Sequence, residues 1–256
     1  MDRYPIRVTL LANAGVLIRY RDTALLLDGL FGRKDNPFSL LPPRLPGDHA
    51  SGRAAPLSGW TICCSPTTIP TTLTRRWSGR FGASKGEGPV FIEGRAPAVQ
   101  NLGRWLQQEG IPCVPLCRRT DRAAIQIEPG ISVQAFMVPH LGEEYRSVPH
   151  VCYLLSFDGR RVLFTADSDY LHEDFSRLAG IPLYAVFLNP LFYQAYYNTR
   201  LFHGHFDTDT LCVYHVPFPE DDGMHMQDMA RRMPRRAADS GLRVLPLTEP
   251  MQQIEL

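Results

Sequence analysis

The sequence lacks an excess of charge of either sign. It has 27 Lys and Arg residues against 26 Asp and Glu residues, which leaves a formal net charge of +1 at pH 7. A nearly neutral chain has no strong field to attract nucleic acid or an anionic membrane surface, so we expect neither as a partner. One local run of positive charge is best explained as the solvated face of a helix, and it consists of Arg231, Arg232, Arg235 and Arg236.

Long hydrophobic runs are also missing. No apolar stretch approaches the roughly 20 residues that a membrane-spanning helix needs, and the N-terminus has no basic-then-apolar leader. The six cysteines do not show the paired spacing of a zinc site, and most lie in apolar stretches where a free thiol packs as a small hydrophobic group. We therefore expect a reduced, cytoplasmic protein.

Short β-prone segments separated by single helices fill most of the chain. With 256 residues it can bury a substantial core, and no internal repeat or linker is evident. This pattern predicts an α/β sandwich with mixed sheets. The expected strands are residues 6–12, 16–20, 24–28, 60–64, 89–93, 113–116, 123–127, 131–138, 151–157, 161–165, 185–188, 211–216 and, as the last, 243–247. The expected helices are about 70–77, 98–109, 171–178 and 224–238, and a long loop rich in Pro and Gly is expected at 29–59.

The hairpin at the centre of the chain organises this pattern. An apolar strand is followed by Asp158-Gly159, which is the strongest short-range signal for a tight hairpin turn. The returning strand ends on Thr165, and two acidic residues come after it, Asp167 and Asp169. A carboxylate next to a buried strand holds a metal, orients a reacting group or caps a helix. We expect Asp169 to cap the following helix and Asp167 to be available for chemistry.

Three potential metal ligands stand at the ends of expected strands in the second half of the chain. They are His140, Asp167 and His215. Two neutral imidazoles and a carboxylate form a ligand set that many metal sites use. A histidine after a strand is also common as a hydrogen-bonded structural residue, so the residue types alone leave both roles open.

Several segments together resemble the metallo-β-lactamase fold and its broad class of metal-dependent hydrolases. The resemblance covers residues from about 8 to 247 and is carried by Leu11-Ala12-Asn13-Ala14-Gly15-Val16-Leu17-Ile18, Leu27-Asp28-Gly29, Thr165-Ala166-Asp167 and the tail from Val213 to Asp222. It implies a single domain over residues 1–256, built as a four-layer αββα sandwich of two mixed sheets flanked by helices. It also implies that His140 is the third-motif histidine, Asp167 the metal-bridging aspartate and His215 the final histidine ligand.

The sequence departs from this family at its metal-binding signature. The family has His-x-His-x-Asp-His in the loop after the strand expected at residues 60–64. Here the four ligand positions are occupied by Ser65, Thr67, Ile69 and Pro70. None of these is a usual zinc ligand, so the two-metal site of the family cannot be built from them.

A second motif of similar composition lies far downstream. His203 and His205, with Asp207, form a His-x-His-x-Asp sequence, but Thr208 stands where the closing histidine would be. The simpler interpretation is a polar loop in which Asp207 caps a turn. Alternatively, His203 and His205 replace the lost ligands, since this segment often lines the pocket in the family.

Two hypotheses remain. The favoured one is a metal-free, non-catalytic or divergent relative of the hydrolases that binds a small molecule or another protein, because all four signature positions are lost together. The alternative is a mononuclear metal-dependent hydrolase of an ester, lactone, thioester or phosphodiester. It would use one divalent ion, such as zinc, at His140, Asp167 and His215, with His203 or His205 as further ligands.

Overall fold

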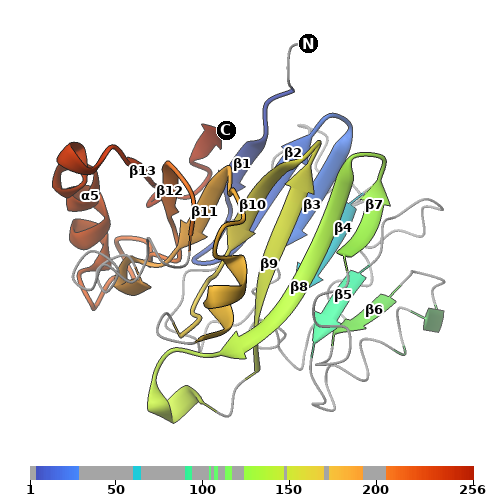
Figure 1. Cartoon of the computed structure of the whole chain (residues 1–256). Coiled ribbons are helices and arrows are strands. Elements are labelled where there is room, and N and C mark those ends of the chain that lie inside the picture. The colour runs from blue at the N-terminus through green and yellow to red at the C-terminus, as the bar shows by residue number, and fades with distance from the viewer. Residues whose placement is uncertain are drawn as a thin grey trace, which may run out of the picture. The chain divides into compact units, whose positions relative to one another are not determined.

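The computed structural model describes residues 4–28, 60–64, 90–93, 104, 107–108, 113–116, 124–146, 149–169, 173–192 and 206–256. Two compact units make up the chain: Met1–Cys117 with Pro250–Leu256, and Arg118–Glu249. Each unit contains one seven-stranded sheet (Figure 1). The loop expected at 29–59, the helix expected near 70–77 and most of the helix expected at 98–109 lie outside the described residues.

The first sheet has the strand order β14-β1-β2-β3-β4-β5-β6. Its antiparallel part joins β14, β1, β2 and β3, and β3, β4, β5 and β6 continue it in parallel. In the antiparallel part Val8, Leu10, Leu17 and Leu26 are all buried. The strand bounds are β1 Arg7–Leu10, β2 Val16–Tyr20, β3 Thr23–Leu27, β4 Trp60–Cys64, β5 Val90–Glu93, β6 Cys113–Leu116 and β14 Gln253–Glu255.

The second sheet has the order β13-β12-β11-β10-β9-β8-β7. Here β7 to β10 form an antiparallel meander, and β10, β11, β12 and β13 run parallel. The expectation of two mixed sheets is therefore confirmed. The strand bounds are β7 Ala124–Glu128, β8 Ile131–Pro139, β9 Pro149–Phe157, β10 Arg160–Phe164, β11 Ala185–Leu188, β12 Thr210–Val213 and β13 Arg243–Pro246.

The β9–β10 hairpin turns at Asp158-Gly159, as the sequence predicts. Both residues have positive φ, 48° and 82°, which is the backbone conformation that a type I′ turn requires. The strands of this hairpin are buried on both faces: Leu155 and its partner Val162 on one face, and Cys152 and Leu163 on the other, are all 0% exposed. A strand with no solvent-facing side is typical of a sheet covered on both faces.

Three expectations about the other elements are corrected. A strand missing from the sequence-based prediction, β14, pairs with β1, so residues 243–247 are not the last strand. The helix expected at 171–178 is described as a 3-10 helix, Glu173–Leu178, and the cap by Asp169 stays a prediction. The helix expected at 224–238 is shorter: α5 covers Met226–Arg236 and includes Pro234.

Helix α5 begins at Met226 because a carboxylate occupies its exposed backbone amides. Asp222 accepts hydrogen bonds from the amides of Met226, at 2.8 Å, and Gln227, at 2.9 Å. Ala230 and Met233 on its inner face are buried in the apolar core of the second unit. The short helices η2, Glu143–Tyr145, and η4, Ala238–Ser240, complete the described elements.

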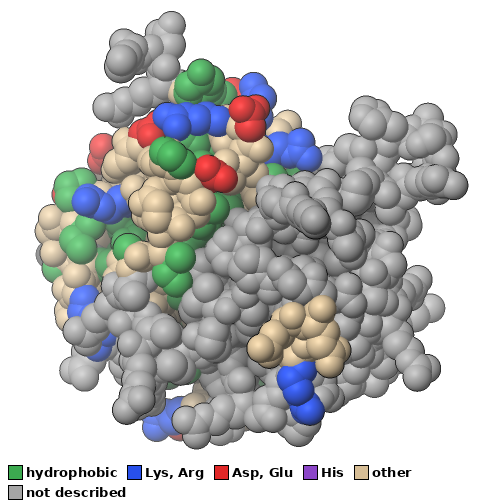
Figure 2. Space-filling model, turned by 90° about the vertical axis from the view of Figure 1, so that its right-hand side faces the viewer, with side chains coloured by type: hydrophobic (Ala, Val, Ile, Leu, Met, Phe, Trp, Pro, Cys, Tyr) green, Lys and Arg blue, Asp and Glu red, His purple; other side chains and the backbone are tan. Residues whose placement is uncertain are grey.

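The surface agrees with the near-neutral composition. On the described part of the face shown in Figure 2, basic and acidic side chains are interspersed with apolar ones. Among the described residues, no helix is long and apolar enough to cross a membrane.

Candidate functional site

The parallel strands of the second sheet bring three polar side chains to one edge. Because β10, β11 and β12 run in the same direction, the residues just beyond them emerge together. Asp167 comes after β10, Asn189 comes directly after β11, and His215 comes after β12. In open α/β sheets, ligands bind outside the carboxyl ends of the strands, and this edge is such a place.

His140 reaches the same edge from the antiparallel side. It comes directly after β8, where a short extra ladder joins the chain to the segment after β10. The amide of Leu141 donates to the Asp167 carbonyl at 2.8 Å, and the amide of Asp169 donates to the Pro139 carbonyl at 2.8 Å. His140 and Ser168 form the bridge between these bonds. Backbone pairing therefore places His140 beside Asp167.

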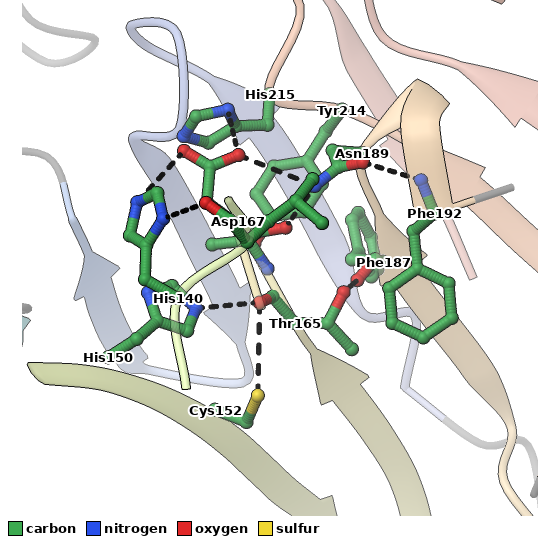
Figure 3. A network of polar contacts seen from close by, with 12 residues as sticks. His140, His150, Cys152, Thr165, Asp167, Phe187, Asn189, Phe192, Tyr214 and His215 are labelled. Carbon is green, nitrogen blue, oxygen red and sulfur yellow. Dashed lines mark hydrogen bonds and ion pairs between the residues drawn. The ribbon is translucent and has the colours of Figure 1, made fainter. Parts of the chain in front are cut away.

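The three predicted ligands converge. His215 Nδ1 lies 3.1 Å from Asp167 Oδ1, and His140 Nε2 lies 3.8 Å from Asp167 Oδ2. Figure 3 shows both imidazole rings turned toward the carboxylate. The side chains are 14% exposed for His140, 24% for Asp167 and 10% for His215, so the cluster is largely but not completely buried.

One ring nitrogen orients each of the two histidines. His140 Nδ1 donates to the Leu141 carbonyl at 2.7 Å, so Nε2 is the nitrogen that faces Asp167. His215 Nδ1 donates to Asp167 Oδ1, which fixes the orientation of that ring. Metal-binding histidines typically have this arrangement, in which the second ring nitrogen donates to a carbonyl or carboxylate.

A third imidazole, which the sequence analysis did not select, lies behind His140. His150, the second residue of β9, is 2% exposed, and its ring is 5.5 Å from that of His140 in an edge-to-face contact. Its Nε2 donates to the Thr165 carbonyl at 2.8 Å, whereas Nδ1 is buried with no hydrogen-bond partner. Desolvation by burial is the largest effect on this ring, and it lowers the pKa of His150 to about 4. The ring is therefore neutral.

The turns that carry two of the candidate ligands have an unfavourable backbone conformation. Ala166, directly before Asp167, has φ of 43°, and His215 itself has φ of 60°. A residue with a Cβ in this left-handed region is strained by about 1 kcal/mol or more, and such residues cluster at functional sites. The surrounding structure must hold both turns in place.

Whether the cluster fits a metal ion depends on its donor set. Among the described residues, no group of three or more His, Cys, Asp and Glu side chains has the spacing of a metal site. The cluster as it stands is linked by a hydrogen bond between His215 and Asp167. The side chains that converge here are nevertheless two imidazoles and a carboxylate, which are ligand types that a divalent transition metal uses. In residue type they suit one ion.

Other candidate residues from the sequence cannot be placed. Ser65, Thr67, Ile69 and Pro70, and also His203 and His205, lie outside the described residues. Asp207 pairs through its backbone with Pro182, and its predicted role as a turn cap stays a prediction. Asn189 was missed, although its position directly after an expected strand was the one signal that could have identified it.

The comparisons with known proteins show the fold. No protein-family model and no curated protein matches this sequence. Among solved structures, Igni18, a metallo hydrolase from Ignicoccus hospitalis, matches with a TM-score of 0.61 and 11% identity over 98% of both chains. The metallo-β-lactamase fold protein YhfI from Bacillus subtilis matches with a TM-score of 0.60 and 14% identity over 98% of this chain and 99% of that one.

A third match comes from a larger enzyme. CmlA, a diiron β-hydroxylase from Streptomyces venezuelae, matches all of this chain with a TM-score of 0.56 and 18% identity. The present chain spans about half the length of CmlA, 54%. At these identities the likeness concerns the fold, and it confirms the predicted metallo-β-lactamase fold over nearly the whole chain.

Proposed function

We propose that this chain is a single-metal protein with the metallo-β-lactamase fold. One divalent ion would be held by His140 Nε2, Asp167 Oδ2 and His215 Nε2, and the protein would hydrolyse a small ester, lactone, thioester or phosphodiester. The sequence alone favoured a metal-free protein. The convergence of three predicted ligands is what changes the balance.

The observation that carries this proposal is the gap between His140 and Asp167. Nε2 of His140 and Asp167 Oδ2 face each other at 3.8 Å. Such an approach is favourable when a positive charge, either a proton on the ring or a metal ion, lies between the two atoms. A separation of 3.8 Å suits two ligands of one ion, since each bond to zinc is about 2.0–2.2 Å long.

Around such an ion, the chain's own residues would bind it, orient one another and reduce the screening of their interactions by water. When bound, a divalent ion lowers the pKa of a coordinated water toward neutrality. Asp167 would use Oδ2 as a ligand while Oδ1 keeps the His215 ring oriented. The buried surroundings of His140 and His215 would strengthen these electrostatic interactions, because water screens them less.

A metal-free binding protein is the second candidate. Specific support for it comes from the sequence, where Ser65, Thr67, Ile69 and Pro70 stand at all four signature positions. Further support is the hydrogen bond of 3.1 Å between His215 and Asp167, which links the cluster without a metal ion. In that case the same edge of the sheet would bind a small polar ligand through hydrogen bonds.

Metal analysis of the full chain separates the two candidates. After removal of bound metal with a chelator, the protein is titrated with Zn²⁺ and Mn²⁺ while stoichiometry and thermal stability are measured. We expect one ion per chain and a rise in melting temperature, because a ligand that binds only the folded state stabilises it. Both effects should vanish in a His140→Ala, His215→Ala double variant.

The matched control changes a histidine outside the cluster. His225 is exposed, and His225→Asn keeps a residue that tolerates its positive φ of 56°. This variant should bind metal like the unmodified chain. Hydrolysis of a panel of nitrophenyl esters, lactones, thioesters and phosphodiesters is then assayed with and without the ion. An absence of metal binding, with no change in melting temperature, would exclude the hydrolase and leave the binding protein.

A further inference from the structure

We infer that Asn189 is a positioning residue for Asp167. Its side-chain amide holds the strained turn before Asp167 and occupies one carboxylate oxygen, so that the other oxygen is left facing His140. The second half of this inference rests on the proposed metal site. The first half, that Asn189 holds the turn, does not.

The turn at Ala166 needs external support. Its φ of 43° is unfavourable for any residue with a Cβ, and Ala166 is 5% exposed, so water does not solvate its peptide groups well. Without partners, the chain would relax toward an ordinary conformation and turn the next side chain away. Asp167 is that next side chain, and its direction therefore depends on whatever fixes Ala166.

Two buried side chains hold the two polar backbone groups of Ala166. Asn189 Nδ2 donates to the Ala166 carbonyl at 2.8 Å, and the Ala166 amide donates to the Tyr214 hydroxyl at 3.0 Å. Asn189 is 1% exposed and Tyr214 is 2% exposed. Figure 3 shows these two side chains reaching the turn from neighbouring strand ends. The turn is therefore clamped at both of its polar backbone atoms.

Asn189 also acts directly on the carboxylate. Its Nδ2 lies 3.3 Å from Asp167 Oδ1, the same oxygen that accepts from His215. Its own oxygen accepts from the Phe192 amide at 2.7 Å, which fixes the amide group and determines which end points at Asp167. Two donors thus converge on Oδ1, and Oδ2 remains for a ligand.

The test replaces only the donor end of this amide. Asn189→Asp has nearly the same shape and still accepts from Phe192, but it cannot donate to Ala166 and it places a second negative charge beside Asp167. The matched control is Gln227→Glu. Gln227 is a buried amide that donates to two carbonyls, of Pro217 and Thr248, so its replacement by Glu makes the same chemical change at carbonyls outside the cluster.

Both variants should lose stability, but only one should affect the site. We expect Asn189→Asp to lower the Zn²⁺ affinity by about 30-fold or more, as the loss of other residues that orient metal ligands does. We expect Gln227→Glu to change the affinity by less than about threefold. A metal-free readout is the NMR shift of the Cε1 protons of His140 and His215 at one fixed pH. These signals should move in Asn189→Asp and stay in place in Gln227→Glu.

A second variant tests the clamp itself. Ala166→Gly removes the conformational strain, because glycine adopts positive φ without penalty. If Asn189 holds the turn, Ala166→Gly should recover part of the stability and of the histidine signals that Asn189→Ala loses. Combined with Gln227→Ala, it should change the stability only by the amount by which it changes the unmodified chain, and it should leave the histidine signals in place. Equal effects in the two backgrounds, or unchanged histidine signals in Asn189→Asp, would overturn the inference.

The two proposals fail in different ways. If the unmodified chain binds no metal, the proposed function is wrong, and the clamp is then decided by the histidine signals and by the Ala166→Gly recovery. If the unmodified chain binds metal and Asn189→Asp binds it equally well, the site stands and the positioning role is refuted.

Discussion

The two sheets have the same internal arrangement. In each, one strand has three antiparallel strands on one side and three parallel strands on the other: β3 in the first sheet and β10 in the second. Each of these strands returns from a hairpin, and each ends close to a positive-φ residue and an aspartate. In the first sheet, Asp28 is both the aspartate and the positive-φ residue, with φ of 45°. In the second sheet, Ala166 has the positive φ and Asp167 is the aspartate.

The sheets differ in the residues at the ends of their parallel strands. In the second sheet, Asp167, Asn189 and His215 come after successive strands. In the first, the segment after β4 begins at Ser65 and has no histidine or carboxylate at the four signature positions. The backbone pattern is thus the same in both sheets, while the three side chains that converge stand in one. The proposed metal site therefore belongs to the second sheet.

Replacing the two corresponding aspartates tests this difference most strongly. Asp167→Asn should lower Zn²⁺ affinity by about 100-fold or more, because it removes a charged ligand from the cluster. Asp28→Asn, a change of the same shape at a residue that is 4% exposed, should leave the affinity within about threefold. Isothermal titration of the chelator-treated chains measures both values.

The proposed difference between the two sheets is refuted if Asp28→Asn weakens metal binding as much as Asp167→Asn does. The first sheet would then contribute to the site despite the loss of its signature residues. Far-UV circular dichroism of both variants is the control, since an unfolded chain would also lose affinity.

The second expected effect is a loss of stability in acid that comes from the second sheet. In the unfolded chain His150 takes up a proton near pH 6.5, whereas desolvation in the folded chain lowers its pKa to about 4. The unfolded state therefore binds more protons between these values, and stability falls as the pH falls. From this residue alone we expect a loss of about 2 kcal/mol between about pH 7.5 and pH 5.

Urea unfolding at several pH values measures this loss, and His150→Phe should flatten the curve over the same range. Hydrogen exchange at about pH 5 adds the comparison between sheets: amides of β8 to β10 should lose protection before those of β1 to β3. An unchanged slope in His150→Phe would show that another group controls acid stability.

Much of the fold could be predicted from the sequence because its strands are short, apolar and bounded by clear turn residues. The bounds predicted for β2, β4, β6 and β11 agree with the structure to the residue. The β14 strand was missed because Gln253–Glu255 is short and alternates weakly, so its pairing with β1 supplies what the local sequence does not. Helix α5 was predicted to begin too early. Its first amide is held by Asp222, which does not adjoin the apolar stripe, so the stripe alone does not reveal where the helix begins.

The candidate site could be predicted only in part. His140, Asp167 and His215 were selected because strand ends and residue types are visible in a sequence. The supporting residues were not, because their roles depend on contacts between distant segments. Tyr214 holds Ala166 across 48 positions of the chain, and His150 reaches the carbonyl of Thr165 through its ring. No local pattern distinguishes such a histidine or tyrosine from an ordinary core residue.

A smaller effect is expected at the hairpin of the second sheet. Gly159 has φ of 82°, and a Cβ there would meet nothing within 4 Å. Gly159→Ala therefore tests conformation alone, and it should cost about 1 kcal/mol of stability in urea unfolding. Gly180→Ala, at φ of 74° with equally open surroundings, is the control outside the hairpin and should cost about the same. A much larger loss at Gly159 alone would mean that this turn also determines strand register.

The corresponding hairpin of the first sheet should respond least, because two effects oppose each other there. Arg21 has φ of 53°, so Arg21→Gly relieves strain of about 1 kcal/mol. The same change removes the guanidinium from its positions over the rings of Tyr4, at 5.4 Å, and Tyr20, at 5.1 Å, and these contacts contribute about 0.5–1 kcal/mol each at an exposed site. We expect a net loss of at most about 1 kcal/mol in urea unfolding. In a Tyr4→Leu background one contact is already absent, so Arg21→Gly should become more favourable by about the value of that contact. If the background makes no difference, the contact between Arg21 and Tyr4 contributes nothing to stability, and the comparison of the two hairpins reduces to the residue that adopts the positive φ in each.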